Sequence, residues 1–406
     1  MSRAILVVMD SVGAGGAPDA ADFFNDDRPD TGANTLGHIA DFCASGRSET
    51  GRSGPLRLPH LDAIGLGAAV RLASGAAMPG LDAAPQGLWG GLWGAAQQVS
   101  PGKDTPSGHW ELAGLPVPFD WHYFPRTDPA LPDELTSDIC RRAGTSGILG
   151  NRHASGTEIL AEEGARHLET GWPIVYTSAD SVLQIAAHEE CFGLARLMAL
   201  CEGLAPGLHA QKVGRVIARP FLGKPGAFER TGNRRDFALV PPEPTLCDWV
   251  YGTGRPVHAV GKIGDIFAGR GITDQIKGDD AALMAGLIQR ISTAADGALI
   301  FANFVEFDSL YGHRRDVSGY ARALEWFDAQ MPRLIAALRP DDLMIFTADH
   351  GNDPTWSGTD HTRERVPVLA VGPYSGQIGI RAFADIGASI AAHLGVPATG
   401  PGRSFL

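Results

Sequence analysis

Three short clusters of acidic and histidine residues stand at or just after segments whose apolar pattern predicts a β-strand. They are Asp10 after residues 5–9, Asp308 with His313 after residues 298–307, and Asp349 with His350 and His361 after residues 343–347. Parallel sheets bind ligands beyond the carboxyl ends of their strands, so we expect the clusters to meet at one sheet edge. Carboxylate and imidazole donors in this number suit two divalent cations about 4 Å apart, an arrangement typical of phosphoryl chemistry.

Around the second and third clusters, predicted helices and strands alternate. Helices are expected at 280–293, 318–338 and 386–394, and strands at 298–307, 343–347 and 366–371. Residues 4–9 form a continuous apolar run, which is typical of a strand buried on both faces. The alternation predicts an α/β fold whose core is a mostly parallel sheet with helices on both faces.

The middle of the chain predicts a separate domain. At 406 residues the chain is long for one compact core. Between residues 122 and 244, turn signals surround short predicted strands at 174–177, 182–187 and 213–218. Candidate metal ligands lie on both sides of this segment, so the simplest interpretation is an inserted, smaller α+β cap domain at 122–244. The metal-binding core would then consist of residues 1–121 and 245–406.

Composition and charge narrow the possible partners. The formal net charge of -12 argues against a nucleic-acid or anionic-membrane binder, because both present phosphate groups. The five cysteines are scattered and contain no CxxC pair, which favours reduced thiols in a cytoplasmic protein. The first apolar run is too short for a signal peptide, and we expect no stretch of the ~18 apolar residues that would cross a bilayer.

Each acidic cluster also has an ordinary structural explanation. Asp308 to His313 could form an Asx-turn followed by an exposed histidine, and Asp349 with His350 could be a simple strand-to-loop turn. The same donor types recur at three strand ends, however, and His361 lies in a loop that could fold back over them. A shared metal centre is therefore the better interpretation. No cysteine accompanies the donors, which favours Mn²⁺ or Mg²⁺ over structural zinc.

A second informative segment, residues 102–111, reads Gly-Lys-Asp-Thr-Pro-Ser-Gly-His-Trp-Glu. It could simply start a helix, with Ser107 as the cap and Glu111 one turn later. That explanation gives no reason for Thr105 between Lys103 and His109. A threonine hydroxyl is a poor nucleophile unless it is activated, so Thr105 makes chemical sense beside a cation pair.

Taken together, these segments resemble the prokaryotic phosphopentomutase family of the alkaline phosphatase superfamily. The similarity runs in order along nearly the whole chain, through residues 8–13, 30–38, 102–111, 176–181, 214–221 and 261–267 and the regions of Asp308, Asp349 and His361. One position departs from the family, which usually has threonine where this chain has Ser107. A hydroxyl is kept there, so we expect little effect.

The resemblance implies a role for each site residue. One cation would be held by Asp308, His313 and His361, and the other by Asp10, Asp349 and His350, with Thr105 phosphorylated between them. In the cap, Ser178 and Asp180 match sugar-contacting positions, and Arg215 and Arg230 match phosphate-binding positions. Lys262 matches another substrate-facing position. Without the resemblance, the two arginines could be solvated surface charges and Asp180 a turn residue.

The implied reaction is the reversible interconversion of (2-deoxy)ribose 1-phosphate and (2-deoxy)ribose 5-phosphate through a 1,5-bisphosphate, primed by a sugar bisphosphate activator. Two alternatives stay open: a phosphohydrolase of the same superfamily, in which water accepts the phosphoryl group, and a non-catalytic metal-stabilised binding protein. Phosphoglycerate mutation on a related core fits poorly, because its nucleophile loop has a different pattern. The native metal, the sugar preference and the oligomeric state are left undetermined by the sequence.

Overall fold

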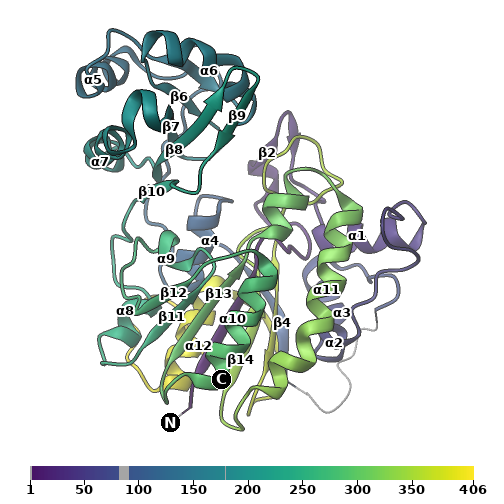
Figure 1. Cartoon of the computed structure of the whole chain (residues 1–406). Coiled ribbons are helices and arrows are strands. Elements are labelled where there is room, and N and C mark those ends of the chain that lie inside the picture. Colours follow the sequence, from purple (N-terminus) through teal and green to yellow (C-terminus); the bar gives the residue numbers. More distant parts are fainter. Residues whose placement is uncertain (1, 82–90, 179) are drawn as a thin grey trace. The chain divides into compact units, whose positions relative to one another are not determined.

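A computed structural model describes residues 2–81, 91–178 and 180–406 (Figure 1). The chain divides into two compact units. Unit 1 consists of Met1–Pro118 and Pro241–Leu406, and unit 2 is Phe119–Val240. Unit 2 thus begins three residues before the expected 122 and ends four residues before the expected 244.

Unit 1 is built on an eight-stranded sheet with the order β12-β11-β13-β1-β14-β15-β4-β16. The strands are β1 (Ala4–Met9), β4 (Leu92–Gln97), β11 (Val257–Val260), β12 (Asp274–Ile276), β13 (Leu299–Phe304), β14 (Leu343–Thr347), β15 (Val366–Val371) and β16 (Gly376–Ala382). Strands β12, β11, β13, β1 and β14 are parallel neighbours, and β4 pairs in parallel with β16. The expected α/β fold with a mostly parallel sheet is confirmed.

Strand β15 runs antiparallel to both of its neighbours, β14 and β4. A parallel return would need a crossover connection, usually a helix. The connection from β14 to β15 contains no helix, so the chain comes back in the opposite direction. The sheet is therefore mostly, and not wholly, parallel.

Helices cover both faces of the unit 1 sheet, with α10 and α11 on one face and α12 on the other (Figure 1). The α-helices of unit 1 are α1 (Thr35–Ala44), α2 (Pro59–Ala63), α3 (Leu66–Ser74), α4 (Thr105–Leu112), α8 (Leu246–Tyr251), α9 (Ile263–Ile266), α10 (Asp280–Thr293), α11 (Val317–Ala336) and α12 (Phe383–Leu394). Unit 1 also contains a short 3₁₀-helix, η1 (Ala20–Asp22), and a π-helix, η3 (Phe307–Gly312). Strands β2 (Phe24–Asn25) and β3 (Arg28–Pro29) form a small separate hairpin. Every residue of β1 is buried, as its continuous apolar run predicted.

Unit 2 contains a mixed six-stranded sheet with the order β10-β8-β7-β6-β5, to which β9 adds by pairing with β8. Its elements are α5 (Asp133–Ala143), β5 (Leu149–His153), α6 (Glu158–Thr170), β6 (Ile174–Thr177), β7 (Val182–His188), η2 (Glu189–Gly193), α7 (Leu194–Ala210), β8 (Arg215–Lys224), β9 (Ala227–Arg230) and β10 (Arg235–Ala238). Strand β8 continues beyond the predicted 213–218 because it extends into a hairpin with β9.

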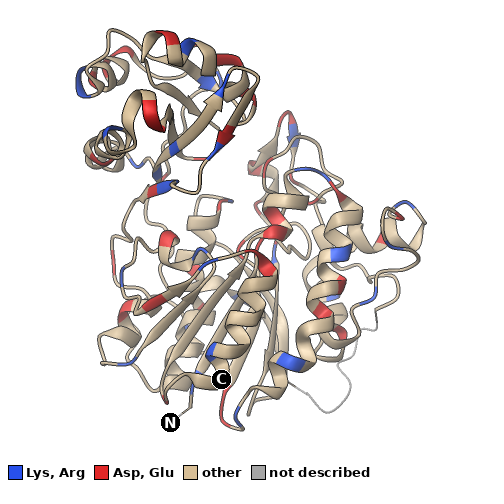
Figure 2. Ribbon diagram, in the orientation of Figure 1, with Lys and Arg blue, Asp and Glu red and all other residues tan. Residues whose placement is uncertain are grey.

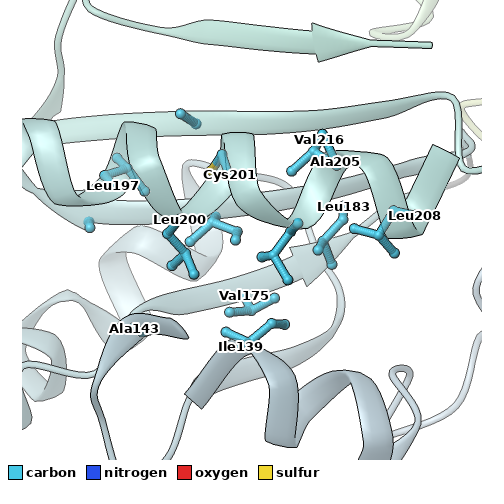
Figure 3. Close-up of a cluster of buried hydrophobic side chains, with 14 of the residues drawn as sticks. Ile139, Ala143, Val175, Leu183, Leu197, Leu200, Cys201, Ala205, Leu208 and Val216 are labelled. Atoms are coloured by element: carbon cyan, nitrogen blue, oxygen red, sulfur yellow. The ribbon is translucent and has the colours of Figure 1, made fainter. Parts of the chain in front are cut away.

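The two faces of the unit 2 sheet carry separate apolar clusters. On one face, Leu197, Leu200 and Leu208 of α7 pack against Val175 and Leu183 of the sheet (Figure 3). On the other face, residues of α6 pack on the alternate positions of β6. The helix Glu189–Ala210 is long and apolar enough for a membrane span among the described residues. Its leucines pack inside the apolar core of unit 2, as those of a core helix do.

Candidate metal centre

The order of the unit 1 sheet places the three acidic clusters side by side. Strand β1 lies between β13 and β14, with Met9 beside Phe304 and Val8 beside Thr347. The carboxyl ends of these strands therefore lead directly into Asp10, Asp308 and Asp349, and all three side chains are buried. Figure 2 shows acidic residues gathered at this end of the sheet.

Two overlapping groups of ligand atoms form there. In one, Asp10, Asp349 and His350 offer atoms within 4.8 Å of one another, and in the other Asp308, His350 and His361 do so. His350 belongs to both groups, whereas the family resemblance implied it for one site only. Its Nε2 lies 3.2 Å from Asp349 Oδ2 and 3.6 Å from Asp10 Oδ1.

His313 lies at the border of the second group. Its Nε2 is 3.0 Å from Asp308 Oδ2, and its ring centroid is 4.8 Å from that of His361. Its Nδ1 is 2.6 Å from the carbonyl oxygen of Thr359. The side chain is 37% exposed, unlike the other five candidate ligands, which are buried. The structure thus brings all six predicted ligands to one place, with His313 outermost.

Unpaired buried atoms show that this place fits a cation. Asp10 Oδ1, Asp349 Oδ2 and His361 Nε2 are buried and make no hydrogen bond of good geometry, although they approach other candidate ligands or His109 at 3.1–3.6 Å. Burying such atoms without a partner is costly, and a divalent cation would remove the cost. The opposite atom of each ligand is held by the protein: Asn303 donates to Asp10 Oδ2 (2.9 Å), Ser11 N donates to Asp349 Oδ1 (3.1 Å), and His361 Nδ1 contacts Lys103 O (2.9 Å). Such partners orient metal ligands.

The electrostatics point the same way. Burial, together with the nearby charges of Asp349 and Asp308, raises the pKa of Asp10 to about 6. Burial opposes the charge on His350, but the carboxylates of Asp349 and Asp10 outweigh it and raise the pKa of His350 to about 10. Burial likewise opposes ionisation of Asp308, yet His313 and His361 hold its pKa well below the usual range. A positive charge close to these carboxylates would therefore stabilise their ionised form.

Thr105 is the hydroxyl next to this centre. It is the first residue of α4, and its Oγ1 lies 3.3 Å from His350 Nε2. Asp104, rather than Ser107, is the helix cap, because its side chain accepts a hydrogen bond from Ser107 N. Ser107 is buried and its hydroxyl donates to Asp104 Oδ2 (2.9 Å). The alternative with Ser107 as cap is therefore wrong.

Sequence reasoning missed Asn303 and gave His109 no partner. Asn303 donates to Asp10 Oδ2 and lies 3.1 Å from His109 Nε2, while His109 Nδ1 is 3.0 Å from the carbonyl oxygen of Thr105 and 3.1 Å from Asp349 Oδ2. These two side chains link the start of α4 to the metal ligands. The available signal was an asparagine inside the otherwise apolar β13, at a position that is fully buried.

The predicted substrate residues are divided between the units. Ser178 and Asp180 follow β6, and Asp180 Oδ2 lies 3.1 Å from Arg215 Nη2 at the start of β8. Arg230 ends β9, so it is separate in the fold from that pair. Lys262 belongs to unit 1, where it is exposed and precedes α9.

An unexpected cationic cluster lies in unit 2, where basic residues are frequent on β8 to β10 (Figure 2). Tyr176 is buried, and its hydroxyl has no hydrogen-bond partner. A side chain at Gly156 would collide with both that hydroxyl and Arg230 Nη2, so the two groups lie against the same backbone. Burial, aided by Arg234 and Arg230, lowers the pKa of Arg219 to about 10. An unpaired phenol among arginines is suited to an anion.

Comparisons with known proteins agree with this chemistry. A family model described as the metalloenzyme superfamily matches residues 2–398. Proteins named phosphopentomutase are similar over the full length of both chains. They include one from Rhizobium leguminosarum bv. trifolii at 57% identity, one from Agrobacterium fabrum at 56% and one from Rhizobium meliloti at 56%, each covering 100% of this chain and 100% of its own.

Proposed function

The chain belongs to the phosphopentomutase family of the metalloenzyme superfamily, and we propose that its buried centre moves a phosphoryl group between the 1- and 5-positions of ribose or 2-deoxyribose by way of Thr105. The observation that carries this mechanism is the Thr105 hydroxyl, 3.3 Å from His350 in the middle of the ligand cluster. A hydrolase would pass the phosphoryl group on to water, with or without a protein nucleophile. A mutase needs a protein group that keeps the phosphoryl group between two half-reactions.

Metal dependence follows from the family and from the unpaired ligand atoms. We propose two cations, Mn²⁺ or else Mg²⁺, held by Asp10, Asp349 and His350 and by Asp308, His361 and His313. When bound, they would neutralise charge on the transferring phosphoryl group and lower the pKa of the attacking hydroxyl.

The protein groups position the reacting hydroxyl. Asp104 caps α4 and so fixes the backbone of Thr105, while His109 holds the Thr105 carbonyl from the next turn. Phosphothreonine 105 transfers its phosphoryl group to the free hydroxyl of the sugar monophosphate, which gives the 1,5-bisphosphate and a free Thr105 hydroxyl. The other phosphate then returns to Thr105, and the isomeric monophosphate leaves. Each cycle thus ends with Thr105 phosphorylated again. A sugar bisphosphate is therefore needed only to phosphorylate Thr105 at the start.

In this proposal unit 2 is the cap domain and supplies the contacts to the sugar phosphate. Ser178 and Asp180 would bind the sugar, and Arg215 and Arg230 its non-reacting phosphate, joined by Arg219 and Tyr176. Lys262 of unit 1 would face the substrate as well. Five free cysteines agree with a reducing, cytoplasmic location. The proposed ligand is a small sugar phosphate. The net charge of -12 disfavours nucleic acid as a binding partner.

The mutase and the hydrolase differ in their products. Purified enzyme with Mn²⁺ and a catalytic amount of ribose 1,5-bisphosphate is expected to convert ribose 1-phosphate to ribose 5-phosphate with little release of inorganic phosphate, measured by ³¹P NMR. Mostly inorganic phosphate with no isomer would identify a hydrolase instead. Metal binding with no turnover at all would identify a binding protein.

The proposed anion site makes a separate prediction. Tyr176→Phe removes only the unpaired hydroxyl, so we expect a KM for ribose 5-phosphate raised about tenfold with kcat nearly unchanged, as for loss of a hydrogen bond to a charged group. Calorimetric stability should stay equal or rise, because the buried hydroxyl has no partner in the free protein. Tyr123→Phe, at an exposed position of the same unit, is the control. An unchanged KM in Tyr176→Phe would remove this side chain from the site.

A further inference from the structure

Arg315 makes more hydrogen bonds than an ordinary surface arginine. Its guanidinium donates to the carbonyl oxygens of Gly358 (2.8 Å), Asp360 (2.9 Å), Gly312 (3.0 Å) and Ser357 (3.2 Å), and to the side-chain oxygens of Asn25 (3.3 Å) and Asn352. The backbone adopts a left-handed conformation at this residue (φ 54°), which is uncommon for a residue other than glycine. Three nitrogens thus tie η3, the hairpin of β2 and β3, and the loop of residues 357–360 together.

These contacts hold groups that neighbour the ligands of one proposed cation site, the site of Asp308, His313 and His361. Asn352 accepts from Arg315 through Oδ1, so its amide nitrogen is directed to Asp308 Oδ1, to which it donates at 2.7 Å. Gly358 and Asp360 flank Thr359, whose carbonyl oxygen contacts His313 Nδ1. Asp360 is followed directly by His361. Among the described residues, Arg315 therefore fixes the surroundings of Asp308, His313 and His361 without a hydrogen bond to any of these three side chains.

The ligands of the other site are held by different groups. Asp10 is oriented by Asn303, and Asp349 by the backbone nitrogen of Ser11. The Nδ1 of His350 lies 3.1 Å from the carbonyl oxygen of Gly351. None of these groups is a partner of Arg315 among the hydrogen bonds of the described residues. Arg315 is thus one step from Asp308, His313 and His361, and more remote from Asp349, which it reaches through Asn352, whose backbone nitrogen donates to Ser11 O (3.1 Å).

We propose that Arg315 is a positioning residue that builds the cation site of Asp308, His313 and His361 selectively, by holding the 357–360 loop and the Asn352 amide in one arrangement. This inference rests on the proposed two-cation centre. Loss of a side chain that orients metal ligands typically weakens metal binding 10- to 100-fold. Here that loss falls on one cation only, so the variant should hold one tightly bound cation where the parent holds two.

Arg315→Met tests this, because methionine keeps much of the side chain's length and removes every donor. Mn²⁺ titrations of metal-free protein, followed by calorimetry, should show one site unchanged within about twofold and the other weakened at least tenfold. Metal analysis after dialysis should find one cation per chain. The neighbouring Arg314→Met, at an exposed position of the same turn, is the matched control and should retain both cations.

A lysine at the same position separates charge from geometry. Arg315→Lys keeps the positive charge but cannot reach acceptors in three segments at once, so the weak site should be restored only in part. Equal weakening of both sites in Arg315→Met, or no weakening of either, would overturn the inference. So would a lower melting temperature of the metal-free variant with both cations lost, because that result indicates a general structural role. These measurements need no turnover, so they stay decisive even if the mutase reaction itself is not observed.

Discussion

Thr105→Val is expected to lose the conversion of ribose 1-phosphate to ribose 5-phosphate by about 10³-fold or more. Valine has nearly the same shape but lacks the hydroxyl that would carry the phosphoryl group, and removing a covalent nucleophile typically has effects of this size. Thr105→Ser keeps a hydroxyl and should retain activity within about tenfold. Coupled assay of ribose 5-phosphate measures the rate, and mass mapping of the primed parent protein should find phosphate on the peptide that contains Thr105.

The matched control for this experiment is Ser107→Ala. The Ser107 hydroxyl donates to Asp104, so its loss removes a hydrogen bond near the start of α4 but no reacting group. Turnover should therefore change little, with a loss of stability of about 1 kcal/mol. If Thr105→Val turned over like the parent protein, or if phosphate were mapped to Ser107, the assignment of the nucleophile would be wrong.

Asp349→Asn is expected to remove turnover to a similar extent, and to do so through the metal. Asp349 is fully buried, and its Oδ2 faces His350 Nε2 at 3.2 Å among the candidate ligands. The neutral amide should weaken cation binding at least 100-fold, which excess Mn²⁺ would not restore at ordinary concentrations. Chelation of the parent protein should abolish activity too, but reversibly.

Stability gives the same experiment a second readout. Mn²⁺ should raise the melting temperature of the parent protein, since at 100 times its Kd a ligand adds about 2.7 kcal/mol to folding. Asp349→Asn should lose this increase. Without metal, the variant should be less stable than the parent, because Asp349 lies 3.2 Å from His350 Nε2 and 3.1 Å from His109 Nδ1, and its loss removes one partner of a buried ion pair. Asp328→Asn is the control. It replaces another buried carboxylate, which binds His60 and Leu61, and should leave the metal-induced increase intact.

Much of the core could be predicted because buried parallel strands have a distinctive sequence. Residues 4–9 and 174–177 are continuous apolar runs, and both are strands with those bounds. The ligand clusters were visible because polar residues follow such runs directly. The reversed direction of β15 was not visible, since it depends on the path of the loop before it rather than on its own apolar residues.

Other features of the site depend on contacts between distant segments, which a single sequence does not display. Ser107 and Asp104 are both acceptable helix caps, and only the backbone geometry chooses Asp104. Arg315 stands beside Arg314 and looks like half of an ordinary surface pair, yet its partners come from three separate parts of the chain. The unpaired hydroxyl of Tyr176 is likewise hidden in the sequence, because tyrosine in a buried strand usually signals packing alone.

The position of His350 between the two ligand groups has a consequence for filling the site. Its Nδ1 faces the Gly351 carbonyl oxygen, so Nε2 offers a single lone pair, and one lone pair serves one cation at a time. In the proposed two-cation centre, Asp10 and Asp349 would hold a cation together with His350. The other site would then have Asp308 and His361 as its buried donors, and His313, the outermost histidine, would complete that set. The centre would load in sequence, from the buried strand ends outward to the loop.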